Sequence, residues 1–177
     1  MPANSSVDRA LVELEKSKVT TLGLVVGKHV GFETGAYIPR ADAQSPPELT
    51  FDAASPDKTY LAVGLDIDAP FISFNVLGPI LHWIQPGFKT SGASSGKLEP
   101  TEPFIANYIG PAPPPLAQPH RYIFFLYEQP ATFDGKKYAP PDGQPLATTK
   151  RMRYSLDDFE KAAGLGEILA LNYFKSN

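Results

Sequence analysis

Apolar residues follow two different spacings along the first third of the chain. Across residues 5–18 they recur every three or four positions, and serines at the start can cap a helix, so this segment is predicted to be helical. Residues 20–26 form a dense apolar run, which predicts a short strand. Residues 48–51 predict another short strand, which we expect to lie at the edge of a sheet.

Three later segments have the patterns of core strands. Residues 60–66 are rich in bulky apolar side chains, and residues 122–127 are rich in aromatic ones. Residues 80–84 form another predicted strand, which contains His82 and the only tryptophan, Trp83. Because side chains alternate between the two faces of a strand, we expect His82 and Trp83 to point to opposite faces.

Turn-forming residues dominate most of the remaining chain, which contains 19 prolines and 14 glycines. Residues 88–102 are expected to form an exposed loop, and residues 132–149 a loop or hairpin. Ser155 opens a short predicted helix that Gly164 ends, and residues 167–174 are expected to form a last helical turn. This abundance of turns favours a mainly β fold over a helix bundle.

Composition narrows the class of protein. A chain of 177 residues is expected to form one domain, residues 1–177. A net charge of −3 without a basic block argues against a nucleic-acid partner, and the absence of cysteine excludes disulfides. No apolar run is long enough to span a bilayer, and Met1-Pro2-Ala3 leads into polar residues without the apolar core of a secretory signal. We therefore expect a soluble, cytoplasmic protein.

A proline-rich stretch precedes the aromatic strand. Because proline restricts its own backbone and that of the residue before it, residues 110–119 cannot form a helix or a central strand. The stretch should be a stiff, extended loop that delivers His120, Arg121 and Tyr122 to the start of a strand, a common place for a binding site. The alternative is a structural crossover in which His120 only satisfies a hydrogen bond.

Two carboxylates end the strand predicted over residues 60–66. Asp66 and Asp68 would face the same side if the strand continued that far. They could be metal ligands, a carboxylate pair or polar strand-end residues, and Arg121 is a candidate to neutralise one of them. The sequence contains no compact metal-binding motif, so neither a metal nor a cofactor is expected.

Two short patterns match known motifs but are weak evidence for the functions of those motifs. Residues 92–96 match the G-x-S-x-G pattern of a hydrolase nucleophile, but no strand precedes them and no helix follows. Residues 111–114 match PxxP, which occurs often by chance in proline-rich loops. Both segments are interpreted as loops.

Several separated blocks stand out along the chain, namely Asp66–Pro70, Leu81–Trp83, Tyr108–Pro115, His120–Tyr122 and Glu128–Gln129. Their order and spacing resemble the phosphatidylethanolamine-binding protein family. The similarity extends over residues 60–129, and the helix near the C-terminus resembles the ending of the family's sequences. The family also includes Raf-kinase-inhibitor-like proteins and plant flowering regulators.

The resemblance implies two antiparallel sheets with short peripheral helices, and one pocket at the strand ends. That pocket would bind anions such as phosphate and phospholipid head groups. The residues that the resemblance assigns to it are Asp66, Asp68, Pro70, His82, Gly110, His120 and Tyr122.

This chain departs from the family pattern in two places. Ile67 stands where the family usually has proline, which would loosen the turn without moving the two aspartates. The C-terminus is short, so Tyr173 or Phe174 would have to replace the helix that covers the pocket in the family.

A carboxylate beside a bound anion requires a partner that removes its repulsion. We expect one of the two aspartates to orient a histidine by a hydrogen bond. The other aspartate is left between two alternatives, contact with an ammonium group of the ligand and neutralisation by Arg121.

The resemblance implies a binding or regulatory protein rather than an enzyme. Its partners would be lipids, kinases or serine proteases, with at most peripheral membrane contact. The same Asp, His and Tyr side chains contain the parts for general acid–base catalysis, so a small enzyme acting on a small molecule is the alternative. A third interpretation is a structural interaction module that uses the proline-rich loop as its surface.

Overall fold

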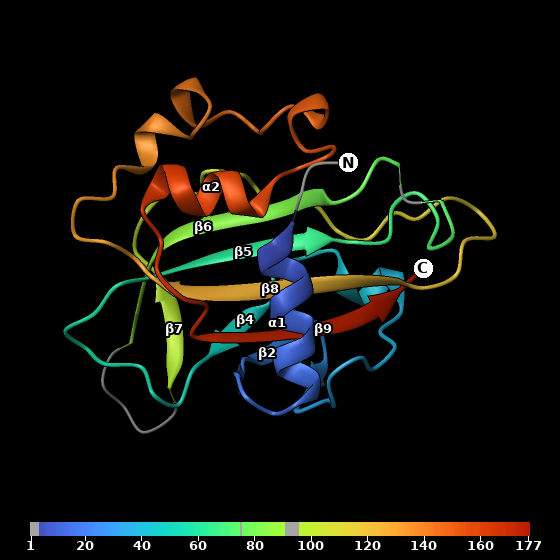
Figure 1. The fold of residues 1–177 in the computed structure, drawn as a ribbon, viewed down its shortest axis with the longest axis horizontal. Coiled ribbons are helices and arrows are strands. Elements are labelled where there is room, and N and C mark those ends of the chain that lie inside the picture. The colour runs from blue at the N-terminus through green and yellow to red at the C-terminus, as the bar shows by residue number, and fades with distance from the viewer. Residues whose placement is uncertain (1–3, 75, 91–95) are drawn as a thin grey trace.

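The chain forms one strongly curled sheet with helices against one face (Figure 1). The computed structural model describes residues 4–74, 76–90 and 96–177. The helices are α1 (Ser5–Glu15) and α2 (Leu156–Ala163), and the strands are β1 (Thr20–Thr21), β2 (Gly23–Val26), β3 (His29–Val30), β4 (Glu48–Thr50), β5 (Tyr60–Asp66), β6 (Ile80–Thr90), β7 (Lys97–Pro100), β8 (His120–Glu128) and β9 (Ala170–Ser176). Short 3-10 turns cover Arg40–Ala43, Gly135–Lys137, Pro141–Gly143 and Thr148–Lys150.

The described strands pair in the order β1-β9-β8-β5-β6-β7-β4-β2-β3. All neighbours are antiparallel except β1 and β9, which run parallel. The expectation of a mainly β fold is confirmed, but the expectation of two separate antiparallel sheets is wrong. The physical reason is β6, in which Phe88 pairs with Tyr60 of β5 on one side and with Pro100 of β7 on the other. This long strand joins both halves into one hydrogen-bonded surface.

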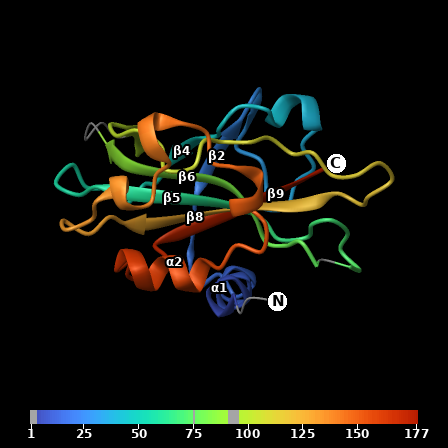
Figure 2. The same cartoon turned by 90° about the horizontal axis from the view of Figure 1, so that it is seen from above.

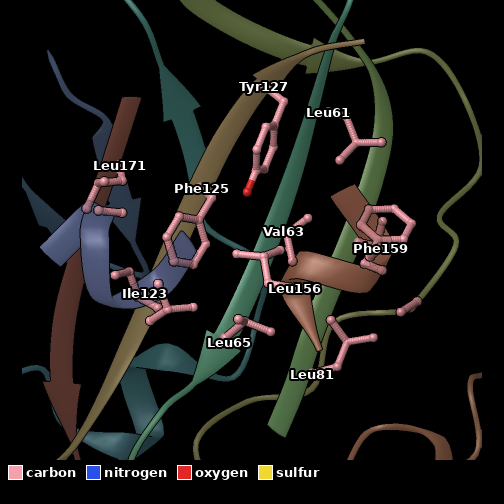
Figure 3. Packing of buried hydrophobic residues seen from close by; sticks show 14 of the residues in the cluster. Leu61, Val63, Leu65, Leu81, Ile123, Phe125, Tyr127, Leu156, Phe159 and Leu171 are labelled. Atoms are coloured by element: carbon pink, nitrogen blue, oxygen red, sulfur yellow. The ribbon is translucent and has the colours of Figure 1, made fainter. Parts of the chain in front are cut away.

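The sheet has a hydrophobic layer on each face. On the outer face, α1 and α2 lie side by side over the central strands (Figure 2). Figure 3 shows the layer beneath them, where side chains of β5, β8 and β9 meet those of α2. The inner face of the curl is packed with aromatic and aliphatic residues from β2, β4, β5, β6, β8 and β9. The central strands are therefore buried on both sides, which explains their almost continuous apolar sequence.

Local sequence signals place several elements correctly. Residues 60–66 form β5 as predicted, and the predicted N-terminal helix exists as α1, which ends at Glu15. The Ser155 hydroxyl accepts a hydrogen bond of 3.1 Å from the Asp158 backbone at the start of α2. Gly164 ends α2 in the left-handed conformation, with φ of 65°.

Long-range pairing overrides the local pattern in three places. The last residues of the chain form strand β9 between β8 and β1, so the predicted helical turn over residues 167–174 is wrong. β4 lies between β7 and β2 and is not an edge strand. The predicted loop over residues 88–102 begins within β6 and contains β7, while residues 91–95, including most of the G-x-S-x-G match, lie outside the described residues. Backbone pairing with distant strands decides these segments.

Neither helix of the described chain reaches the length that a bilayer crossing requires.

The core under α2 offers a direct test of the packing. Phe125 of β8 is fully buried, so Phe125→Ala is expected to lower the free energy of unfolding by about 3–5 kcal/mol. Leu116 is fully exposed on the proline-rich loop, and Leu116→Ala should change it by less than about 0.5 kcal/mol. Chemical denaturation monitored by circular dichroism measures both, and similar small losses for the two variants would contradict this packing.

Candidate functional site

Four strand ends meet at one edge of the sheet, at the right in Figure 1. β5 ends at Asp66, which pairs with Tyr122 near the start of β8 and with Ile80 at the start of β6. β9 ends at Ser176, which pairs with His120. Because directly opposed residues of paired strands share a face, this register brings together the side chains of Asp66, His120, Tyr122 and Ser176.

A β-bulge places the second histidine at the same edge. Trp83 pairs with Gly64, while Leu81 pairs with the next residue of β5, so His82 is an extra residue in β6. A bulge of this kind breaks the alternation of side chains along a strand.

The bulge turns His82 toward the inner face of the sheet. The ring centroids of His82 and Tyr122 lie 5.0 Å apart, and those of Trp83 and Phe124 lie 6.4 Å apart. Tyr122 and Phe124 are two residues apart on β8 and share a face. The expectation that His82 and Trp83 point to opposite faces is therefore wrong, and the inserted residue is the reason.

Asp66 and His120 form a buried pair. Oδ2 of Asp66 lies 2.8 Å from Nδ1 of His120, and Oδ1 accepts a 2.9 Å hydrogen bond from the backbone of Asp68. Burial alone would lower the pKa of His120, but the hydrogen bond and the charge of Asp66 raise it above its ordinary value, with help from Asp68 and the Pro70 carbonyl. His120 is thus favoured as an imidazolium whose Nδ1–H is donated to Asp66. The expectation that one aspartate orients a histidine is confirmed.

His82 has the opposite electrostatic environment. Burial lowers its pKa, and this effect outweighs the charge of Asp66 and a hydrogen bond to the Ile109 carbonyl. The positive charges of Arg151 and His120 lower the pKa further. Nδ1 of His82 lies 2.7 Å from the Ile109 oxygen, so that nitrogen carries the proton of a neutral ring.

Asp68 is held by Arg121. Its carboxylate accepts two side-chain hydrogen bonds from Arg121, at 2.7 and 2.8 Å, and a 2.9 Å bond from the Arg121 backbone. Of the two alternatives left open for the second aspartate, the structure shows the pairing with Arg121. Since β5 ends at Asp66, the two-residue alternation does not extend to Asp68, and the two carboxylates have different partners.

Three buried polar atoms at this edge have no hydrogen-bond partner among the described residues: Nε2 of His120, the hydroxyl of Tyr122 and Oγ of Ser176. The ring of Tyr122 is fixed by stacking on Phe174, with centroids 5.4 Å apart. Burial raises the pKa of Tyr122, and the nearby charge of Asp66 raises it further, so the phenol keeps its proton. Each of the three groups can donate a hydrogen bond, and unpaired buried donors are costly unless something else satisfies them.

Pro70 and Gly110 have different surroundings. Pro70 follows a cis peptide bond, and its carbonyl contributes to the raised pKa of His120. Gly110 is covered by the amide of Gln44, because a Cβ built on Gly110 would lie 2.5 Å from Gln44 Oε1. The lack of a side chain at Gly110 therefore allows close packing with Gln44, a contact that the sequence patterns did not indicate.

Arg151 is a buried cation that the sequence patterns also missed. Its guanidinium donates to the carbonyl oxygens of Leu81, Leu146 and Asn107 and to the Asn107 side chain, at 2.6–3.1 Å. No carboxylate within the described chain lies at salt-bridge distance from it. The charge of Arg151 lowers the pKa of His82, so it adds positive electrostatic potential near the two histidines. A position inside a loop carries no periodic signal that could have revealed this residue.

No group of three or more His, Asp or Glu side chains in the described part of the chain is arranged to hold a metal ion.

Comparison with known proteins identifies the family of this chain. The model of the phosphatidylethanolamine-binding protein family matches residues 28–174. The chain belongs to this family.

Individual relatives within and around the family are distant. Phomoidride biosynthesis cluster protein N from Talaromyces stipitatus is 33% identical over 101 residues, covering 54% of this chain and 48% of the relative. The carboxypeptidase Y inhibitor of Saccharomyces cerevisiae is 27% identical over 120 residues, covering 61% of this chain and 51% of the inhibitor. The chain thus spans about half the length of these curated relatives.

A solved structure supports the fold over nearly the whole chain. The crystal structure of carboxypeptidase Y inhibitor complexed with its cognate proteinase matches with a TM-score of 0.74. The match covers 98% of this chain and 93% of that chain at 21% identity, a level that establishes the shared fold.

The two histidines of the cluster should titrate on opposite sides of the ordinary value of about 6.5. In an NMR titration of the imidazole C–H signals, we expect His120 to titrate above it and His82 below it. Asp66→Asn should lower the pKa of His120 because it removes the charge that stabilises the imidazolium. Asp57→Asn, in an exposed turn, is the matched control.

The raised pKa of His120 determines how the stability of the fold changes with pH. A raised pKa in the folded state means that the Asp66–His120 pair stabilises the fold below about pH 6.5, and that this contribution disappears as pH rises through the folded-state pKa. Asp66→Asn should therefore cost more free energy of unfolding at pH 6 than at pH 9. A cost that grows with pH would contradict the assignment.

Proposed function

We propose that this family member binds a phosphate-type anion, free or as a phospholipid head group, at the cluster of His120, Tyr122 and Ser176. The observation that carries the proposal is a set of three buried polar atoms on one face of β8 and β9 that have no partner in the described part of the chain. Three donors converging from neighbouring strands match the several acceptor oxygens of a tetrahedral anion.

The charges around the cluster favour an anion despite the two aspartates. Asp66 is balanced by protonated His120, and Asp68 by Arg121. Arg151 then leaves an excess of positive charge behind the site. With Nδ1–H committed to Asp66, only the protonated ring of His120 presents a second N–H, at Nε2, to a ligand.

The hydroxyl of Tyr122 gives the sharpest test. Tyr122→Phe keeps the stacking on Phe174 but removes one donor, so affinity for sulfate, inorganic phosphate and phosphoethanolamine should fall about tenfold in calorimetric titrations. Tyr127→Phe is the matched control, because the hydroxyl of Tyr127 bonds to Glu160 on the outer face of the sheet.

Sulfate separates the titration of the protein from that of the ligand, since its charge is constant between pH 5 and 9. Its affinity should decrease as pH rises through the raised pKa of His120, because Nε2 then changes from donor to acceptor. His120→Gln should flatten this dependence. Binding that is independent of pH, or equal in Tyr122→Phe and the unmodified protein, would contradict the site. Tighter binding of phosphoethanolamine than of phosphate would identify a head group as the ligand.

We also propose that the chain inhibits a protease of the carboxypeptidase class. The support is the likeness to a carboxypeptidase Y inhibitor, both among curated relatives and among solved structures. The chain offers a stiff, protruding loop over residues 110–119, in which Leu116 is fully exposed at a φ of 68°. A rigid loop loses little entropy when a protease cleft closes on it.

Inhibition can be measured as the loss of peptide hydrolysis by carboxypeptidase Y at increasing concentrations of the chain. We expect concentration-dependent inhibition that Leu116→Asp weakens about tenfold, because it places a charge at an apolar contact. Val30→Asp, at an exposed position on β3, is the control and should inhibit normally. Unchanged hydrolysis at a large molar excess of the chain would contradict this second function.

A further inference from the structure

A cavity lies on the outer face of the sheet. It has a volume of about 710 Å³. Its floor is formed by Leu81 and Ile84 of β6 and by Ile105, and Phe159 of α2 forms one wall. The segment 138–150, orange in Figure 1, forms the rest of the wall and the rim together with Tyr154. Cavities of about 300–1,000 Å³ are typical of small-molecule sites.

This cavity is separate from the proposed anion site at His120, Tyr122 and Ser176, which is called the anion cluster below. Leu81 belongs to the outer hydrophobic layer, whereas the bulge turns the neighbouring His82 toward the inner face. None of the residues assigned to the anion cluster lines the cavity. A ligand here would be held by different side chains and by a different face of the sheet.

The cavity wall is stiff. Pro140, Pro141 and Pro145 all line it, and proline restricts the backbone. Tyr138 is anchored by a 2.8 Å hydrogen bond from its hydroxyl to the Ala162 carbonyl at the end of α2. The wall therefore keeps its shape without a ligand, so binding costs little conformational entropy.

Lys150 is the one basic residue among those that line the cavity. No salt bridge or hydrogen bond joins its ammonium to another described residue. Arg151 lies next in sequence, buried and bonded only to uncharged oxygens. Asp142 is the one acidic lining residue, and it sits on the exposed rim. The floor is apolar, so the cavity offers an apolar surface with a cation at one end.

We propose that this cavity binds an amphipathic monoanion, an aromatic or aliphatic molecule that carries a single acidic group. The apolar part lies against Leu81, Ile105 and Phe159, and the acidic group contacts Lys150. Burial of the apolar part supplies most of the affinity, and the charge of Lys150 selects anions over neutral molecules of the same shape.

Two fluorescent probes with the same rings test this selection. 1-Anilinonaphthalene-8-sulfonate carries one anionic group, and N-phenyl-1-naphthylamine lacks it. The sulfonate should bind more tightly, and Lys150→Gln should weaken it about five- to tenfold while leaving the neutral probe unchanged. Lys137→Gln is the matched control, because Lys137 is exposed on a neighbouring turn outside the cavity lining.

A second variant tests the location. Ala147 is an exposed lining residue, so Ala147→Phe should fill the cavity without disturbing the core and weaken both probes at least tenfold. Tyr122→Phe should leave both probes unaffected, which separates this site from the anion cluster. Circular dichroism checks that each variant is folded. Equal affinity for the two probes, an unchanged affinity in Lys150→Gln, or no effect of Ala147→Phe would overturn the proposal.

Discussion

The pairing of β5 with β8 is the constraint on which the rest of the molecule depends. In this register Asp66 lies opposite Tyr122, and its carboxylate reaches Nδ1 of His120 two residues earlier on β8. Both strands are buried on their two faces, so a shift by one residue would exchange the inner and outer layers and remove the Asp66–His120 hydrogen bond. The same register therefore determines both the core packing and the geometry of the Asp66, His120 and Tyr122 side chains.

The cluster combines groups whose charges balance in pairs. Asp66 with His120 and Asp68 with Arg121 form two ion pairs at the end of β5, and Arg151 adds an unbalanced positive charge from behind. The pKa values of the two histidines are shifted in opposite directions, because the charge of Asp66 favours protonation of His120 while burial keeps His82 neutral. A negatively charged ligand would complete this arrangement without a further protein cation.

The two proposed sites lie on different faces of the sheet. The inner edge presents three donors that have no partner among the described residues, which is the basis for proposing a small polar anion there. The outer face presents a wide apolar cavity with Lys150 at one end, which suits a larger amphipathic molecule. The bulge at His82 separates the two, because it turns one residue of β6 inward while Leu81 stays in the outer layer.

Local and short-range information in the sequence determined much of this protein. It placed α1, α2 with its Ser155 cap, the strand over residues 60–66 and the proline-rich loop, because each depends on neighbouring residues and on backbone preference. The blocks around Asp66, His82 and His120 indicated the family, which the family match over residues 28–174 establishes.

Only the tertiary structure decided the features that depend on distant pairing. These are the single curled sheet, β9 as a strand, the bulge that re-aims His82, the packing of Gln44 on Gly110, and the positions of Arg151 and Ser176. The physical reason is that hydrogen bonds between strands, and the burial of a cation within loops, depend on residues far apart in the chain. No periodicity or short motif records such contacts.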